Sequence, residues 1–513
     1  MTSSGSGPVS TQAERWCRGV ARNPAAPLDL LLRLLGTAPV CASRALKARL
    51  DLPAAVEKAM AGHPSPEVRG MLAEHPRVRP EIRGRLLADP DTRVMVRAFG
   101  APGQPPLSDD MVNGLLARIE DLPPEALLTP GEAYSELWPA MRYDRRLYRL
   151  AAAHPDPRVR RHAAAHPHWL DEASRAALLT DPVPAIRAAT AAAIAEDERV
   201  MRPADLPDRH RHAFAAVLQR PLSRALVDQV VADGDDEALF FVAANPSTPP
   251  DVVSALLRHP AAIIRRRVAG RSDLNHEQLL ALAADPAAEV RTAVSVHPGL
   301  TERERAGIDI DVTTIDGDGH FGTAGRCRSE GHPSAEPVPP LADASRWAGS
   351  VNPLLRRRAA RNPELPAEAV DALADDPDPG VRILLALHHP GVPPRLLLRC
   401  HLEYHGCGRD QLIDNPRFPS AGLAVFADHA DPSVRLLVAR DPDAEPALVA
   451  RLVNDPDAPV RQAMASCPRL PVPRIIELLD DPDLGEYAAA NPRLPVEAMY
   501  RIAAPADGSL TPR

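Results

Sequence analysis

The chain has 513 residues and a formal net charge of −8 at pH 7, and hydrophobic residues make up 45% of it. The acidic balance disfavours a protein whose whole surface binds nucleic acid or anionic lipid, and the apolar content exceeds that of a disordered chain. Aromatic residues make up only 3%, whereas the chain contains 58 prolines. So many prolines without low complexity indicate a residue that recurs at a fixed interval, as in repeat proteins.

Residues 1–18 are expected to be a flexible N-terminus, and they lack the charged and apolar regions of a signal peptide. No apolar stretch approaches the roughly 20 residues that span a bilayer, so no membrane contact is expected. The cysteines are scattered over the chain, unlike those of a disulfide-rich secreted fold. We therefore expect a cytoplasmic protein.

The N-terminal repeat block, residues 19–105, defines the period of the chain. Its marker residues, most of them prolines, lie alternately 14 and 12 residues apart, which gives a repeat of 26 residues. The markers are Pro24, Ala38, Leu50, Pro64, Pro76, Pro90 and Pro102. The same spacing returns in a central repeat block, residues 151–298, and in a C-terminal repeat block, residues 350–503. A period sustained over so much of the chain is a strong sign of a repeat architecture.

Each half of the repeat predicts a short helix. The longer half reads N/H-P-x-L-P with apolar residues three and four apart, as in the segment that starts at Asn362. The shorter half reads D-P-x-x-x-V-R, as at Asp285 and Asp455, where Asp is an N-cap and Pro the first helical residue. This second helix could be a 3₁₀ segment or a short α-helix. Neither helix can bury its apolar face alone, so the repeats must stack into an all-α solenoid of two-helix repeats.

The two half-repeats together resemble the leucine-rich repeat variant family. The resemblance depends on the recurring x-L-P mark, at Leu52-Pro53, Leu365-Pro366, Leu470-Pro471 and Leu494-Pro495. It implies repeats that pair an α-helix with a 3₁₀-helix in a right-handed superhelix without strands. The D-P-x-x-x-V-R half alone is also similar to HEAT-type repeats. Some members of the variant family carry an N-terminal iron-sulfur cluster, but Cys17 and Cys41 alone do not supply the four thiolates such a cluster needs, so no cofactor is expected.

A first break in the period, residues 106–150, is expected to be an irregular helical connector rich in aromatic residues. Its aromatic side chains either fill a gap between repeat blocks, which is the favoured interpretation, or form a contact patch for a partner. The candidates for that patch are Tyr134, Trp138, Tyr143 and Tyr148.

A second break, residues 299–349, is predicted to be an inserted loop. Alternation at Ile308, Ile310 and Val312, followed by a turn at residues 316–319, indicates a small hairpin, with His320 and Phe321 as further candidates for partner binding. The acidic residues of the turn lack the offsets of a calcium loop. The period resumes near Asn352-Pro353, and residues 504–513 are expected to be a flexible tail.

An arginine recurs five residues after many of the markers and forms an Arg ladder along the predicted solenoid. Such a ladder could follow nucleic-acid phosphates, or each Arg could bind a capping Asp and free carbonyl groups of a nearby repeat. The acidic charge and the scarcity of aromatic residues favour the structural interpretation. The Arg ladder consists of Arg69, Arg160, Arg187, Arg265, Arg291, Arg356, Arg382, Arg409, Arg435 and Arg461.

Histidines recur directly before the marker prolines, where other repeats place Asn, Asp or Cys. A position that accepts all of these is typical of a capping site rather than of a catalytic one. The histidines are His63, His75, His154, His166, His259, His297 and His389. A separate cluster of Cys400, His401, His405 and Cys407 has residue types that bind zinc, but the period runs through it without an insertion, so no metal is expected.

No P-loop, G-x-S-x-G, H-E-x-x-H or paired C-x-x-C motif occurs in the sequence. We therefore predict a bacterial, non-enzymatic scaffold that binds a macromolecular partner, most simply a protein, through its concave face and its irregular segments. The alternative is a HEAT-like protein that binds nucleic acid or repairs bases with a concave Arg ladder. The sequence leaves the identity of the partner and the oligomeric state open.

Overall fold

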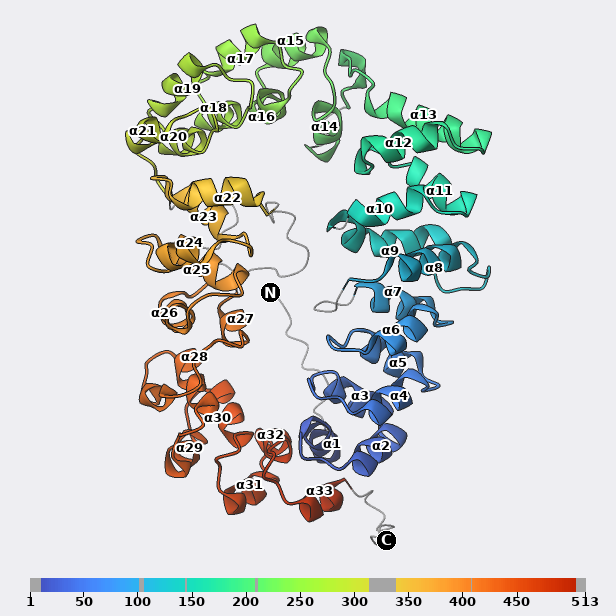
Figure 1. The fold of residues 1–513 in the computed structure, drawn as a ribbon, viewed down its shortest axis with the longest axis vertical. Helices are drawn as coiled ribbons and strands as arrows, with labels where there is room; N and C mark the ends of the chain where they lie inside the picture. Colours follow the sequence, from blue (N-terminus) through green and yellow to red (C-terminus); the bar gives the residue numbers. More distant parts are fainter. Residues whose placement is uncertain are drawn as a thin grey trace. The chain divides into compact units, whose positions relative to one another are not determined.

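The computed structural model describes residues 11–100, 106–143, 145–207, 211–312, 338–406 and 408–503. These residues form short helices in succession and no strand, and one isolated parallel bridge joins Met201 to Leu222. The predicted all-helical solenoid is thereby confirmed (Figure 1). The chain divides into two compact units: unit 1 comprises residues 1–193 and 420–513, and unit 2 comprises residues 194–419.

Unit 1 begins with the N-terminal repeats and the connector. Its helices there are α1 (Gln12–Arg22), α2 (Leu28–Thr37), α3 (Pro39–Leu46), α4 (Ala54–Ala61), α5 (Pro66–Ala73), α6 (Pro80–Leu87), α7 (Thr92–Gly100), α8 (Asp109–Glu120), α9 (Pro130–Tyr143), α10 (Arg145–Ala152), α11 (Pro157–Ala164), the 3₁₀-helix η1 (Pro167–Trp169), α12 (Glu172–Leu179) and α13 (Pro184–Asp197), in which the boundary falls.

The C-terminal repeats complete unit 1. They consist of η3 (Leu423–Phe426), α28 (Pro432–Arg435), η4 (Leu436–Arg440), α29 (Pro446–Leu452), α30 (Ala458–Ala465), α31 (Val472–Leu478), α32 (Gly485–Ala489) and α33 (Val496–Ile502).

Unit 2 contains the central repeats and the start of the C-terminal block. Its helices are η2 (Pro203–Asp205), α14 (Arg211–Leu218), α15 (Arg224–Asp233), α16 (Asp236–Ala244), α17 (Pro250–Leu256), α18 (Ala262–Ala269), α19 (His276–Ala283), α20 (Ala288–Ser295), α21 (Glu302–Ala306), α22 (Leu341–Ala348), α23 (Pro353–Ala360), α24 (Ala367–Ala374), α25 (Pro379–His388), α26 (Pro394–Glu403) and α27 (Arg409–Ile413).

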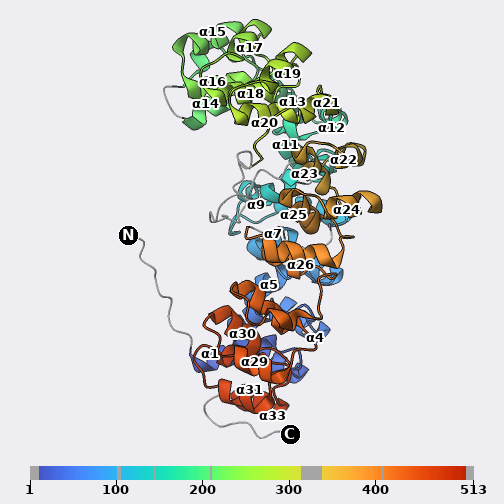
Figure 2. The same ribbon diagram turned by 90° about the vertical axis from the view of Figure 1, so that its left-hand side faces the viewer.

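The half-repeats alternate in space as they do in the sequence. In the central repeats α14, α16, α18 and α20 lie along one side of unit 2, and α15, α17 and α19 lie along the other (Figures 1 and 2). Each helix is too short to be stable alone in water, so its stability must come from packing. The buried side chains are mainly Leu, Val and Ala, for example Val290 and Val294 of α20. Small side chains allow the short helices to approach one another closely.

Two sequence expectations need correction. The shorter half-repeats are mostly α-helices of about two turns, such as α11 and α18, which is one of the two expected forms, but Asp285 and Asp455 are not N-caps. Helix α20 begins after Ala287 and α30 after Asp457, so the Asp-Pro pair precedes the helix. Residues 308–312 do not form a strand. Instead, Asp309 accepts hydrogen bonds from Arg291, and the backbone N–H of Asp311 donates to Thr292 Oγ1, 3.0 Å away, so this extended segment packs on α20. The turn at 316–319 lies outside the described residues, and α22 shows that helical packing resumes before residue 350.

Candidate functional site

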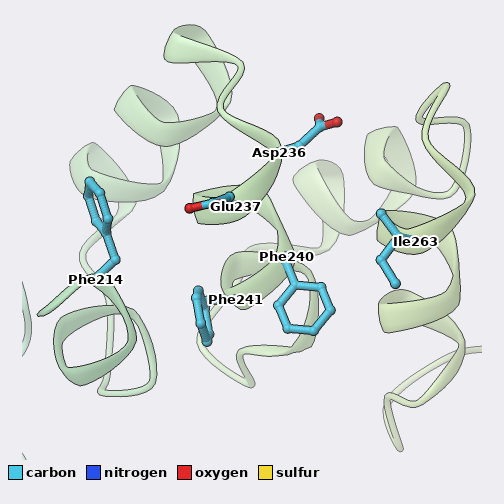
Figure 3. A pocket seen from close by; sticks show the side chains of 6 residues that line it. All are labelled: Phe214, Asp236, Glu237, Phe240, Phe241 and Ile263. Atoms are coloured by element: carbon cyan, nitrogen blue, oxygen red, sulfur yellow. The ribbon is translucent and has the colours of Figure 1, made fainter. Parts of the chain in front are cut away.

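A pocket of about 360 Å³ lies on the side of the central repeats formed by α14, α16, α18 and α20. It is lined by residues of three alternate helices that lie next to one another: Phe214 of α14, Asp236, Glu237, Phe240 and Phe241 of α16, and Ile263 of α18 (Figure 3). All three helices belong to unit 2, and neighbours among them are in contact. The repeat packing therefore fixes the spacing of these side chains.

The helix phase of α16 explains why two phenylalanines reach the pocket. Leu239, Val242 and Ala243 are buried in the core, at the spacing of one helix face. Phe240 and Phe241 fall outside that face, and their rings meet edge to face with centroids 5.5 Å apart. Ile263 is also 38% exposed, which is high for a large apolar side chain. The pocket thus has apolar walls that the repeat core does not cover.

A cation already lies on one of these rings. The guanidinium carbon of Arg267 is 4.1 Å from the centroid of Phe240, within the range of a cation–π interaction. Burial, together with the nearby charge of Arg266, lowers the pKa of Arg267 from its usual value. The ring of Phe240 therefore compensates in part for the lost hydration of a positive charge.

Two carboxylates border the pocket at the start of α16. Asp235 caps this helix by accepting a hydrogen bond of 2.9 Å from the backbone N–H of Glu237. Asp236 and Glu237 follow in the first turn, where negative charge also stabilises the helix dipole. The Asp236 side chain is 61% exposed and lies 3.8 Å from His259. Apolar walls with an acidic border fit a ligand that is both apolar and positively charged.

The Arg ladder is engaged in structural contacts within each unit. Arg265 donates from Nε and Nη2 to both carboxylate oxygens of Asp285, at 2.7 and 2.9 Å, and from Nη1 to the carbonyl oxygens of His259 and Pro260. Hydrogen bonds to Asp285 raise the pKa of Arg265 above its usual value. The same geometry recurs for Arg69, Arg160, Arg356 and Arg435, each with an Asp 20 or 21 residues later.

The remaining members of the ladder keep part of this pattern. Arg187 and Arg461 donate to the two carbonyl groups that precede their helices, Arg382 also pairs with Glu403, and Arg291 also pairs with Asp309. Arg409 donates to the carbonyl oxygen of His401. These contacts agree with the structural interpretation of the ladder, because the same groups cannot bind phosphates without giving up these hydrogen bonds.

The marker histidines close the turns before helices, and the helix N-caps are later residues, such as Ser65, Asp156 and Ala261. In His63, His75, His154, His259, His297 and His389, the ring Nδ1 accepts a hydrogen bond from the backbone N–H two residues later. Asn23 and Asp89 accept the same bond with their side-chain oxygens. The opposite ring nitrogen of His297 lies 2.9 Å from the carbonyl oxygen of Arg271, one repeat earlier. The position therefore joins successive repeats, which explains why several polar residues serve there.

The aromatic residues of the connector pack inward. Tyr134 and Tyr148 are only 2% and 1% exposed. Tyr134 stacks on His162 at 3.7 Å and donates to Glu120, and Tyr148 stacks on Trp169 at 5.8 Å. Burial raises the pKa of Tyr148 to about 12. The prediction that these two residues form a surface patch for a partner is therefore wrong, and they fill the core as the favoured interpretation expected. The side chains of Trp138 and Tyr143, and all of His320 and Phe321, lie outside the described residues.

The cysteine and histidine cluster is divided by the end of α26. Cys400 and His401 are buried on that helix, His405 is exposed beyond it, and Cys407 lies outside the described residues. Burial raises the pKa of the Cys400 thiol to about 12. Among the residues the structure describes, no three His, Cys, Asp or Glu side chains are placed to hold a metal ion.

The pocket residues Phe214, Phe240 and Phe241 were missed by the sequence analysis. A signal was present, because these are three of only seven phenylalanines in the chain, and two of them are adjacent. These phenylalanines lie where the repeat period is unbroken, whereas the sequence analysis placed its candidate binding residues at the breaks in the period.

Comparisons with known proteins leave the chain without a family assignment. No protein-family model matches it, and no curated protein is similar to it at a significant level. Within the described ranges, the helices are all too short or too polar to cross a membrane.

Proposed function

We propose that the protein is a non-enzymatic repeat scaffold that binds a segment of another protein in the pocket of Phe214, Phe240 and Phe241. The observation that carries this proposal is that these partly exposed rings line one pocket together with the exposed carboxylates Asp236 and Glu237. A segment with an apolar side chain next to Lys or Arg matches both features, because the apolar group enters the pocket and the cation pairs with the border.

Several features support a binding role over catalysis or nucleic-acid recognition. The six lining residues offer recognition groups but no nucleophile with an adjacent base. The arginines of the ladder, which could have bound nucleic-acid phosphates, donate hydrogen bonds to carboxylates and carbonyl groups of the chain instead. Cys17, Cys41, Cys400 and Cys467 are free thiols, in keeping with the cytoplasmic location that we also propose. Relationship to the leucine-rich repeat variant family and a bacterial origin stay predictions.

A synthetic amphipathic peptide of leucine and lysine tests the proposal by isothermal calorimetry on the full chain. We expect binding that weakens at least about tenfold in Phe241→Ala and in the double variant Asp236→Asn/Glu237→Gln. The matched control is Phe426→Ala, which removes a partly exposed phenylalanine of unit 1. A counterpart peptide with glutamate in place of lysine should not bind.

The proposal fails if Phe241→Ala and Phe426→Ala bind the peptide equally well, or if the glutamate peptide binds as tightly as the lysine peptide. Salt-dependent binding of a DNA duplex that is lost in Arg265→Ala, without peptide binding, would favour the nucleic-acid alternative.

A further inference from the structure

The two ends of the described chain meet inside unit 1. Helix α1 packs against α32 as α5 packs against α7 and α18 against α20 in consecutive repeats. Although 468 positions separate Gln12 from Asp480, their side chains form a hydrogen bond of 2.9 Å. We call the contact of α1 and α2 with α31, α32 and α33 the seam (Figure 1).

The seam repeats the hydrogen bonds of a normal repeat junction. Within the C-terminal block, Asn491 Nδ2 donates to the carbonyl oxygens of Ala465 and Cys467, at 2.9 and 2.7 Å. Across the seam, Asn23 Nδ2 donates to those of Ala489 and Asn491, at 3.0 and 2.6 Å. Both Asn side chains are fully buried. The first repeat therefore occupies the place that a repeat following the last one would take.

Ion pairs and close packing make the seam specific. Glu486 of α32 accepts from Arg18 and Arg22 of α1 at 2.6 Å, and Trp16 Nε1 donates to the carbonyl oxygen of Leu479 at 2.8 Å. A Cβ atom at Gly19 would lie 2.5 Å from the Cβ of Ala489 and would also overlap the backbone of Glu486. The helices thus approach at a distance that only glycine permits at position 19.

The seam also covers apolar surface that a solenoid end would otherwise expose. Val20 and Ala21 of α1 and Ala488 and Ala489 of α32 are fully buried in one continuous core. Terminal repeats of a solenoid ordinarily need polar outer faces for solubility. In this chain the first and last described repeats cover each other instead.

We infer that the first and last repeats form a specific, separable seam that closes the chain on itself. Along the chain, residues 194–419 of unit 2 separate the two segments of unit 1. If the seam opens, unit 1 becomes two blocks that are connected only through unit 2. This closure is independent of the pocket and of its proposed ligand.

Gly19→Leu in the full chain tests the seam by hydrogen exchange with mass spectrometry. We expect the amide exchange rates in α1, α32 and α33 to rise at least about tenfold over those of the unaltered chain, and the rates in the helices of unit 2 to stay unchanged. Gly36→Leu is the matched control, because it lies on the neighbouring helix α2 and a Cβ there meets nothing within 4 Å. Equal exchange of α32 in the two variants would overturn the inference.

Two further variants keep the test decisive if Gly19→Leu does not fold. Glu486→Gln removes the charge that holds Arg18 and Arg22 and should also speed exchange in α1 and α32. The control Glu477→Gln removes an exposed ion pair of α31 and should not change the exchange rates.

A circular permutant that runs from residue 326 to 513 and then from 1 to 325 makes the seam a covalent junction. It should retain the helical circular dichroism and a Tm within a few degrees of the native order. A permutant that does not fold contradicts the inference.

Discussion

Aromatic residues gather in two regions of this aromatic-poor chain, and they are buried in one region and partly exposed in the other. In the connector, Tyr134 and Tyr148 are buried and stack on His162 and Trp169. In unit 2, Phe240 and Phe241 stay partly exposed and line a pocket. The difference lies in helix phase, because Tyr134 shares the buried face of α9 with Leu137, whereas the core face of α16 is already filled by Leu239 and Val242. Aromatic density alone therefore does not distinguish a core from a binding surface.

Tyr148→Ala should have the largest effect on stability. It removes a fully buried ring from its stack on Trp169, and we expect the free energy of unfolding to fall by about 4 kcal/mol. Denaturant titration followed by circular dichroism measures this. A loss as small as that of an exposed aromatic residue would mean that the connector is not part of the core of unit 1.

Arg265→Ala should cost about 3 kcal/mol, because it leaves Asp285 buried without its counter-ion. The Asp285 side chain is only 6% exposed. The matched control is Arg291→Ala, whose partner Asp309 is 91% exposed and should be rehydrated, so its loss should be clearly smaller. Arg265 lies on the same helix as Ile263 of the pocket, and thermal unfolding of both variants shows whether the ladder supports this face. Equal losses would mean that the burial of the partner does not matter.

Lowering the pH should destabilise the contact between α11 and the connector, where His162 stacks on Tyr134. Burial, together with the nearby His166, lowers the pKa of His162 to about 4, from a usual value of 6.5. The unfolded chain then binds the proton first, so the free energy of unfolding should fall by about 2 kcal/mol as the pH drops from 6.5 to 4. His162→Phe should remove this part of the pH dependence, whereas the exposed His168→Phe should keep it. Parallel pH profiles of the two variants would contradict the assignment.

Phe241→Ala should have the smallest effect on stability, at most about 1 kcal/mol, because the ring is partly exposed and borders a pocket. The same variant should have the largest effect on binding of the leucine and lysine peptide. Chemical unfolding and calorimetry of one preparation give both quantities. A loss of several kcal/mol would show that Phe241 belongs to the core.

Much of the architecture could be predicted from the sequence. The alternating spacing and the Asp-Pro and His-Pro marks predicted pairs of short helices, since turns and apolar spacing are local properties. The arginine that lies five residues after many of the markers could be assigned a structural role, and Arg265 shows it with Asp285 and two carbonyl groups. The interpretation was weakest where the period breaks. Residues 308–312 alternate like a strand, yet they have no partner strand in the described chain and pack on α20 instead.

By itself the sequence determined the repeat length and the succession of paired short helices, because these depend on residues close together in the chain. Only the tertiary structure decided which aromatic residues stay exposed, since that depends on the phase of each helix against its neighbours. It alone also decided that the first repeat continues the last. The Asn-Pro marks at Asn23 and Asn491 look alike in the sequence. The residues around Asn23 do not indicate that its side chain donates to the carbonyl oxygen of Asn491, 468 positions away. Stacking is a contact between surfaces, and a matching surface serves equally well whether or not the chain connects it.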